Sequence, residues 1–243
     1  VDSSNLFSTA NSALTDAVVG AGSSTTSCGT ECQDTINWAR GFDVRDANGD
    51  NSTTDAVQFM GDPLHGRPAV VTYGGVPGAP DDKDTVLFFP TNDGFLHAIN
   101  GKDGAERWAF IPQELLSRLN TLYKNNAVAQ RSYGLDGDVQ VLKFDKNQDG
   151  IIDATKDDKV YLFFGMRGGG DRYFALDVTN RDDPQLMWDI GPSELPGIGQ
   201  SWSPPVITRI MVGTGGSANG NDEKFVLVFG GGYDTGQEVQ PYS

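Results

Sequence analysis

Short runs of valine, phenylalanine, leucine and tyrosine recur along most of this chain, and glycine or Asp-Gly sequences follow many of them. Runs of this length bounded by turn residues are typical of β-strands joined by tight turns. From residue 67 onward the runs repeat. The sequences RPAVVTYGG, TVLFFPTNDG, FLHAIN and AERWAFIP predict four strands, and DVQVLKFD, KVYLFFGMRGGG, RYFALDVTN and PQLMWDIG predict four more.

The two copies agree in detail. His97-Ala98-Ile99-Asn100 corresponds to Phe174-Ala175-Leu176-Asp177, and a tryptophan follows each, Trp108 and Trp188. A third copy begins with PPVITRIMVG and KFVLVFGGGYD. Four antiparallel strands closed by an aromatic residue are typical of a propeller blade.

We therefore predict a mainly β protein with the quinoprotein-like blades of a β-propeller. The expected blades span about 67–112 and 137–191, and a third starts at about 203–234. Propellers close with about four to eight blades. We expect 36–243 to be an incomplete propeller domain, part of a larger ring.

Two segments read as helical. The spacing of Leu6, Ala10, Leu14 and Val18 predicts a helix, and a Gly/Ser/Thr-rich linker follows it, so that 1–35 forms a separate helical and linker segment. Between the first two blades, PQELLSRLNTLYKN carries leucines at helical spacing. It predicts a helix packed on the rim of the propeller.

The sequence FDKNQDGIID at 144–153 contains the clearest chemical signal. Asp145, Asn147 and Asp149 occupy positions 1, 3 and 5 of a calcium loop, and a glycine stands at position 6, where the loop turns sharply. Ile151 at position 7 offers its carbonyl oxygen, and Asp153 at position 9 replaces the usual last ligand, because Lys156 stands at position 12. This oxygen-rich set favours Ca²⁺ over a transition metal. The alternative is an acidic hairpin turn.

A second acidic loop, DVRDANGDNSTTD, repeats the spacing with Asp46, Asn48 and Asp50. Position 6 is Asn51 rather than glycine, so this is the weaker candidate for a cation site. Asp43 and Asp55 could contribute oxygen atoms. A solvated acidic loop is the alternative.

The net charge of −15 argues against nucleic acid as a partner, because a phosphate-binding surface needs clustered lysine and arginine. No apolar run is long enough to span a bilayer, and the first residues do not resemble a signal peptide. Cys28 and Cys32 fit a short-loop disulfide in an oxidising compartment, with two free thiols as the alternative.

The remaining candidates read as structural. We expect His65 to be hydrogen-bonded in a turn and His97 to pack within a strand. Trp108, Trp188 and Trp202 are expected to pack within blades rather than form a carbohydrate platform. No Gly-x-Ser-x-Gly sequence is present, and the glycine runs lead into strands rather than helices, so neither a serine nucleophile nor a phosphate loop is indicated.

Several ordered motifs stand out along the chain: Trp38-Ala39-Arg40-Gly41, Gly61-Asp62-Pro63-Leu64-His65-Gly66-Arg67-Pro68, Thr91-Asn92-Asp93-Gly94-Phe95-Leu96-His97-Ala98, Trp108-Ala109-Phe110-Ile111-Pro112, Tyr133-Gly134-Leu135-Asp136-Gly137 and Phe164-Gly165-Met166-Arg167. Together they resemble the PilY/PilC family of type IV pilus biogenesis factors and tip-associated adhesins, over about residues 36–236.

The resemblance is to the first part of the family's C-terminal β-propeller domain. It implies a calcium loop at Asp145, Asn147, Asp149, Ile151 and Asp153 that influences pilus extension against retraction. It also implies an exported, non-enzymatic protein of a Gram-negative type of cell, at the pilus tip, cell surface or outer membrane. The implied partners are minor pilins of the tip complex and host or surface ligands, with roles in adhesion and twitching motility.

Two other classes stay open. A scaffold that calcium only rigidifies would gain stability on binding without changing pilus behaviour. A quinoprotein dehydrogenase would share the blades and their tryptophans, and would need a cofactor pocket on a complete ring.

Overall fold

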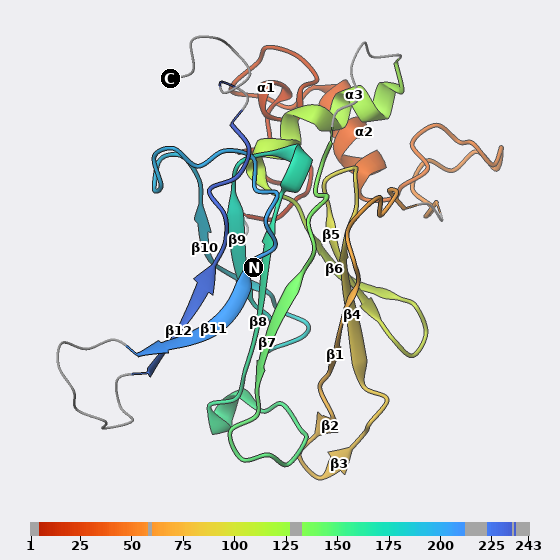
Figure 1. The fold of residues 1–243 in the computed structure, drawn as a ribbon. Helices are drawn as coiled ribbons and strands as arrows, with labels where there is room; N and C mark the ends of the chain where they lie inside the picture. The colour runs from red at the N-terminus through yellow and green to blue at the C-terminus, as the bar shows by residue number, and fades with distance from the viewer. Residues whose placement is uncertain (1–4, 58–59, 127–132, 212–222, 235, 237–243) are drawn as a thin grey trace.

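Two antiparallel four-stranded sheets form where the repeat predicts them (Figure 1). The computed structural model of the chain describes residues 5–57, 60–126, 133–211, 223–234 and 236. The first sheet consists of β1 (Ala69–Thr72), β4 (Thr85–Pro90), β5 (Leu96–Asn100) and β6 (Glu106–Phe110). The second consists of β7 (Gln140–Phe144), β8 (Lys159–Gly165), β9 (Tyr173–Asp177) and β10 (Gln185–Ile190).

The two sheets repeat in register as well as in strand order. Trp108 on the fourth strand of the first sheet pairs with Ala98, and Trp188 pairs with Ala175 at the same place in the second. Each pairing adjoins a register shift, which is a β-bulge at the same point of both sheets. The sequence correspondence therefore reflects a real structural repeat.

A third unit contributes the two-stranded sheet of β11 (Val206–Met211) and β12 (Glu223–Val228). Separately, β2 (Gly75–Val76) and β3 (Ala79–Pro80) form a small hairpin between β1 and β4. The first strands of the three units are neighbours, because β7 contacts both β1 and β11. The mainly β, antiparallel architecture is confirmed. The described residues form no closed ring, so the propeller stays a prediction.

The main core lies between the first two sheets. Strand β4 buries alternate residues, including Val86 and Phe88, as expected for a strand with one face on a core. Strand β8 is more completely buried: Val160, Leu162 and Phe164 are fully inaccessible. Burying side chains of this size contributes about 1.5–3 kcal/mol each.

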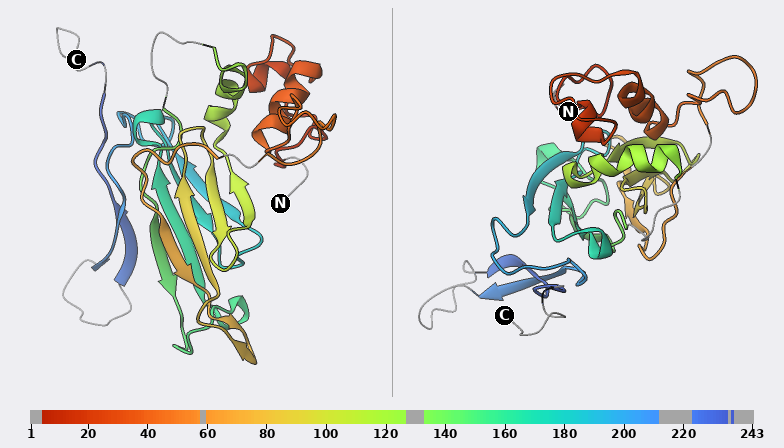
Figure 2. Two further views of the ribbon diagram at one scale, coloured as in Figure 1. Left: turned by 90° about the vertical axis from the view of Figure 1, so that its right-hand side faces the viewer. Right: turned by 90° about the horizontal axis from the view of Figure 1, so that it is seen from above.

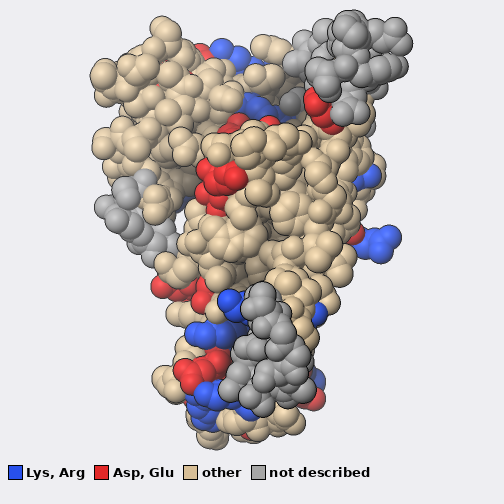
Figure 3. All heavy atoms as spheres, turned by 60° about the vertical axis from the view of Figure 1, so that its left-hand side comes forward, with Lys and Arg blue, Asp and Glu red and all other residues tan. Residues whose placement is uncertain are grey.

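The third unit buries less of its apolar surface than the first two. On the side of the molecule turned forward in Figure 3, lysine, arginine and acidic side chains lie close together toward one end. Large apolar side chains are exposed on β10, β11 and β12: Leu186, Met187, Val206, Ile210, Met211, Phe225 and Val228.

Helices gather at one end of the sheets (Figures 1 and 2). They are α1 (Asp16–Val19), α2 (Thr30–Ala39), the 3₁₀ helix η1 (Gln113–Arg118) and α3 (Leu119–Lys124). A second core lies at this end and includes Phe95, which directly precedes β5. Its other buried residues are Leu14, Val19, Cys32, Ile36, Leu116 and Leu119. The helix predicted between the first two units is confirmed in place, with a 3₁₀ first part.

The helix expected through Leu6–Val18 is wrong in extent. Only Asp16–Val19 is helical, and turns precede it. The Asn11 side chain donates to the Leu6 carbonyl (2.9 Å) and accepts from the Ala13 N–H (3.0 Å), which replaces helical hydrogen bonds by local ones. The segment expected as a linker instead holds the start of α2, and the predicted disulfide between Cys28 and Cys32 is present there.

Candidate calcium-binding loop

The acidic sequence predicted to bind calcium forms the hairpin between β7 and β8, at the end of the sheets away from the helices (Figure 1). Asp145 follows the last residue of β7. Asp153 caps the short 3₁₀ helix η2 (Ala154–Lys156), and β8 begins shortly after it. The five predicted ligand residues therefore lie in one short connection between the paired strands β7 and β8.

The first half of the loop is curled by its own carboxylates. Asp145 accepts the backbone N–H groups of Gln148 and Gly150, each at 2.8 Å. Asp149 accepts the N–H of Ile151 at 2.9 Å. Gly150 adopts φ +83°, the left-handed conformation that glycine reaches at little cost. Positions 1, 5 and 6 thus take the turn that the calcium-loop spacing predicts.

A lysine lies where a divalent ion would be expected. Lys156 Nζ is 2.9 Å from Asp149 Oδ2, and the Asn147 side-chain N–H₂ donates to the same oxygen at 2.9 Å. This ammonium group, helped by the Ile151 N–H, holds the pKa of the Asp149 carboxyl below its usual range. Position 12, which supplies a glutamate in EF-hands, here supplies a cation.

The second half of the loop is held by a buried carboxylate. Asp158 is fully buried and accepts the N–H groups of Lys146 (2.8 Å) and Asp153 (2.9 Å). The Asp153 carboxylate itself accepts the Thr155 N–H (2.9 Å) and hydroxyl (2.7 Å), which lower its pKa. Asp153 therefore turns toward η2.

The donor set fits Ca²⁺ in chemistry, and its arrangement is partly formed. Three carboxylates, an amide oxygen and a backbone carbonyl are the hard oxygen ligands that Ca²⁺ takes. Among the described residues, however, Asp145, Asp149 and Asp153 do not form a group with ligand atoms within 4.8 Å of one another. Such a site would hold the ion with the curled first half of the loop, once Asp153 turns inward and Lys156 moves away.

The loop is attached to the first sheet. The Ile152 N–H donates to the Tyr73 carbonyl (2.8 Å), and the Ile152 side chain is part of the main core. Gly74 packs so closely that a Cβ there would lie 2.0 Å from the Gly150 carbonyl oxygen. No local sequence pattern indicates this contact between the loop and the two residues that separate β1 from β2, because it joins residues far apart in the chain.

The weaker candidate, the loop at 43–55, has a different interior. Asp43 is buried and accepts the N–H of Ala47 with both oxygens at 2.9 Å. Asn48 donates to Asp50 (3.2 Å) and Asp55 (3.0 Å), and Asp46 accepts the Asn51 N–H (3.1 Å).

The other candidates have structural roles with one exception. His65 Nδ1 contacts the Asp136 carboxylate at 3.0 Å. His97 contacts Glu106 at 2.6 Å, and its ring packs beside Phe89 and Phe95. His65 is therefore hydrogen-bonded and His97 packs within a strand, as predicted.

Trp108 and Trp188 pack against phenylalanines of their own sheets, as predicted. Trp202 is the exception: its side chain is 44% exposed and lies outside the sheets. Sequence reasoning grouped it with the other two because it also stands near a predicted strand. Asp16, Cys28 and Cys32 lie close enough together to be considered as metal ligands. They offer no free thiol, because both cysteines are in the disulfide.

The fold and the loop define a class: a mainly antiparallel β protein built from four-stranded units, with an oxygen-rich candidate cation loop on one hairpin. A scan against models of known protein families found no match. Type IV pilus biogenesis factor PilY1 of Pseudomonas aeruginosa strain UCBPP-PA14 is 30% identical over 183 residues, covering 67% of this chain and 15% of that protein. PilY1 of strain PAO1 is 29% identical over 227 residues, which cover 85% of this chain and 18% of that protein.

A PilY1 homolog of Xylella fastidiosa strain Temecula1 is 26% identical over 203 residues, covering 76% of this chain and 16% of that protein. The crystal structure of the P. aeruginosa PilY1 C-terminal domain is 28% identical, with a TM-score of 0.42 over 64% of this chain and 26% of that chain. The chain belongs to the PilY1 family of type IV pilus biogenesis factors. It spans 15 to 18% of the length of the relatives described here. None of the described helices is long and apolar enough to cross a membrane.

Proposed function

We propose that this chain is a calcium-binding part of a type IV pilus biogenesis factor, and that calcium at 145–153 biases pilus extension against retraction. The observation that carries the proposal is the loop itself. Asp145, Asn147, Asp149 and Asp153 have calcium-loop spacing, Gly150 makes the required turn, and the relatives of the chain are named pilus biogenesis factors.

The proposed action is a population shift. Without a divalent ion, Lys156 neutralises Asp149 and Asp153 faces η2. With calcium, the carboxylates turn toward the ion, and the hairpin is held in one conformation. A ligand shifts such an equilibrium only by its differential affinity for the two states. Because the loop contacts Tyr73 and Gly74, the change reaches the first sheet.

The wider context is part of the same proposal. The three units are blades of a β-propeller, and the protein is exported to the pilus tip, cell surface or outer membrane. Minor pilins of the tip complex are its partners, and adhesion to host or surface ligands and twitching motility depend on it. The relatives' names support a non-enzymatic role over a quinoprotein dehydrogenase.

Pilus assays in cells test this function. The encoding gene would carry Asp153→Ala, with Lys146→Gln as the control, since Lys146 pairs with Asp157 outside the predicted ligand set. We expect altered surface pilin and twitching in the first strain and normal values in the second. Equal amounts of protein with unchanged pili would contradict the switch.

A calcium-rigidified scaffold is the second candidate, and the Ile152–Tyr73 contact favours it, because the loop joins two sheets. In that case Asp153→Ala lowers the calcium-dependent gain in stability and leaves pili unchanged.

A further inference from the structure

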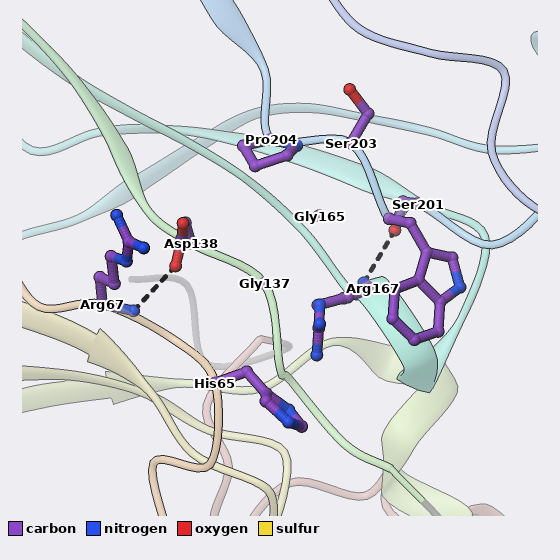
Figure 4. A pocket seen from close by; sticks show the side chains of 10 residues that line it. His65, Arg67, Gly137, Asp138, Gly165, Arg167, Ser201, Ser203 and Pro204 are labelled. Carbon is purple, nitrogen blue, oxygen red and sulfur yellow. Dashed lines mark hydrogen bonds between the residues drawn. The ribbon is translucent and has the colours of Figure 1, made fainter.

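A cleft of about 380 Å³ (Figure 4) is lined by residues that precede β1, β7 and β11, whereas the acidic loop follows the far end of β7. Three of the segments that form it lead into the first strands of the three units: Arg67 precedes β1, Asp138 precedes β7, and Pro204 precedes β11. Arg167, just after β8, completes the wall. The cleft is therefore separate from the candidate calcium loop in position and in residues.

A buried carboxylate fixes the shape of one wall. Asp136 is only 2% exposed, and it contacts His65 Nδ1 at 3.0 Å and Arg167 at 2.9 Å. It also accepts the backbone N–H of His65 at 3.2 Å. The buried Asp136 carboxylate thus holds the His65 imidazole and the Arg167 guanidinium, which come from different units, at the same surface. These two groups in turn provide the hydrogen-bond and charge partners that a buried carboxylate needs.

Arg167 is held in an uncommon backbone conformation. It adopts φ +54°, a region that residues other than glycine rarely enter. Ser201 Oγ accepts the N–H groups of Met166 (2.8 Å) and Arg167 (3.1 Å) and stabilises this turn. Residues kept in such conformations cluster at binding sites, where the surrounding structure offsets the strain.

Arg167 lies against Trp202, with its guanidinium carbon 4.5 Å from the ring centroid. In Figure 4 the Arg167 guanidinium points toward the side of the cleft where His65 lies. Stacking leaves the edges of an arginine able to donate. Arg167 Nη1 donates to Asp136, so the Nε–Nη2 edge is the one that can match the two oxygens of a carboxylate or phosphate. The half-exposed Trp202 adds an apolar wall beside it.

Arg67 provides the second cation. Its guanidinium makes no ion pair within the described part of the chain, in contrast to Arg107, Arg172 and Arg181, each of which contacts a carboxylate. Asp138 lines the cleft too, but its carboxylate accepts the backbone N–H of Arg67 (2.9 Å). Two arginines and one aspartate thus line the cleft, in a protein whose net charge is −15.

We propose that this cleft binds a small ligand through an oxyanion group, a carboxylate or a phosphate. Arg67 and the free edge of Arg167 donate to the oxyanion, and Trp202 contacts the apolar part of the ligand. Asp136 and Ser201 are positioning residues that keep Arg167 in place.

Titration of the ¹⁵N-labelled chain with citrate, and separately with inorganic phosphate, tests the proposal at constant ionic strength set by chloride. Arg67→Gln is the test variant, because this exposed side chain has no ion pair to lose. Arg209→Gln is the matched control: it removes the same charge from β11, where the guanidinium lies over Phe225.

We expect saturable shifts of the Arg167 and Trp202 side-chain signals with at least one of the two anions. Affinity falls about tenfold in Arg67→Gln, equivalent to about 1.4 kcal/mol, and stays unchanged in Arg209→Gln. Response to citrate alone identifies a carboxylate site, and response to phosphate alone identifies a phosphate site. No saturable shift with either anion, or equal losses in both variants, would overturn the proposal.

Discussion

Two loops of this chain carry the same Asp-x-Asn-x-Asp spacing, and the structure gives them different surroundings. The loop at 145–158 contains its own counter-ions, because Lys156 pairs with Asp149 and Lys146 with Asp157. In the loop at 43–55, no basic side chain pairs with a carboxylate among the described residues. Arg45 turns away and donates to the Tyr123 carbonyl.

The attachment of the two loops also differs. Ile151 and Ile152 anchor the first loop in buried surroundings beside the first sheet. The second loop projects from the body of the molecule (Figure 1), and the Phe42–Ala56 bridge closes its base. Asp55 Oδ1 is buried there without a hydrogen-bond partner among the described residues. The spacing of the acidic residues alone therefore does not define a cation site. Cation affinity also depends on how the loop is anchored and on whether each carboxylate oxygen already accepts a hydrogen bond.

The largest expected effect comes from breaking the attachment of the first loop. Gly74→Ala places a Cβ 2.0 Å from the Gly150 carbonyl and strains a backbone with φ +83°. We expect unfolding in denaturant to show a loss of about 3 kcal/mol, the range of severe packing defects.

Gly78→Ala is the matched control, since Gly78 has φ +85° and nothing within 4 Å of its added Cβ. Left-handed strain alone costs about 1 kcal/mol. Equal losses in the two variants would show that the contact between the loop and the first sheet contributes nothing.

The buried carboxylate of each loop gives the next largest effect. Asp158→Ala and Asp43→Ala each leave backbone N–H groups without their acceptor, and each is expected to cost about 2 kcal/mol by denaturant unfolding. The exposed neighbours Asp157 and Asp50 are the controls, and their replacement by alanine costs less than about 0.5 kcal/mol. The comparison sharpens when calcium is added: only Asp158→Ala is expected to weaken binding.

Removing the Lys156 ammonium group is expected to have a smaller effect, and to strengthen calcium binding where Asp158→Ala weakens it. Lys156→Gln frees Asp149 for a divalent ion, and we expect calcium affinity to rise about threefold, because the ion no longer displaces a lysine from the carboxylate. Lys146→Gln is expected to leave the affinity unchanged. Weaker binding after Lys156→Gln would mean that the lysine supports the site rather than competing for it.

The smallest expected effect is a pH dependence of stability that arises in the first loop. Hydrogen bonds from Lys156 and Thr155 lower the pKa values of Asp149 and Asp153 from the ordinary 3.8. Because the folded pKa values are depressed, these groups stabilise the fold above about pH 4 and lose that contribution as the pH falls through the folded values. Acid unfolding curves of Lys156→Gln should show a smaller loss of stability below about pH 4 than those of the unchanged chain. An unchanged curve would remove Lys156 as the cause.

Much of the fold could be predicted because strand periodicity and turn residues are local signals. Both four-stranded sheets, and even the equivalence of Trp108 and Trp188, follow from a repeat that every local segment supports. The N-terminal helix was wrong because the side chain of Asn11 competes for backbone groups, which hydrophobic spacing does not record.

The candidate site was predictable only in part. Spacing identified Asp145, Asn147 and Asp149, but not that Lys156 would pair with Asp149 or that Asp153 would face η2. The contacts with Tyr73 and Gly74 and the cleft around Asp136 join residues about seventy positions apart, and a single sequence carries no local sign of such contacts.

Calorimetric titration of Ca²⁺ into the intact chain tests the central claim most directly, with Mg²⁺ as the competing ion and Asp153→Ala and Asp50→Ala as a pair of variants, one in each loop. We predict saturable binding of about one ion, weak for Mg²⁺, which Asp153→Ala abolishes and Asp50→Ala leaves intact. Absence of binding, or loss of binding in Asp50→Ala with retention in Asp153→Ala, would contradict the assignment of calcium to the loop at 145–153.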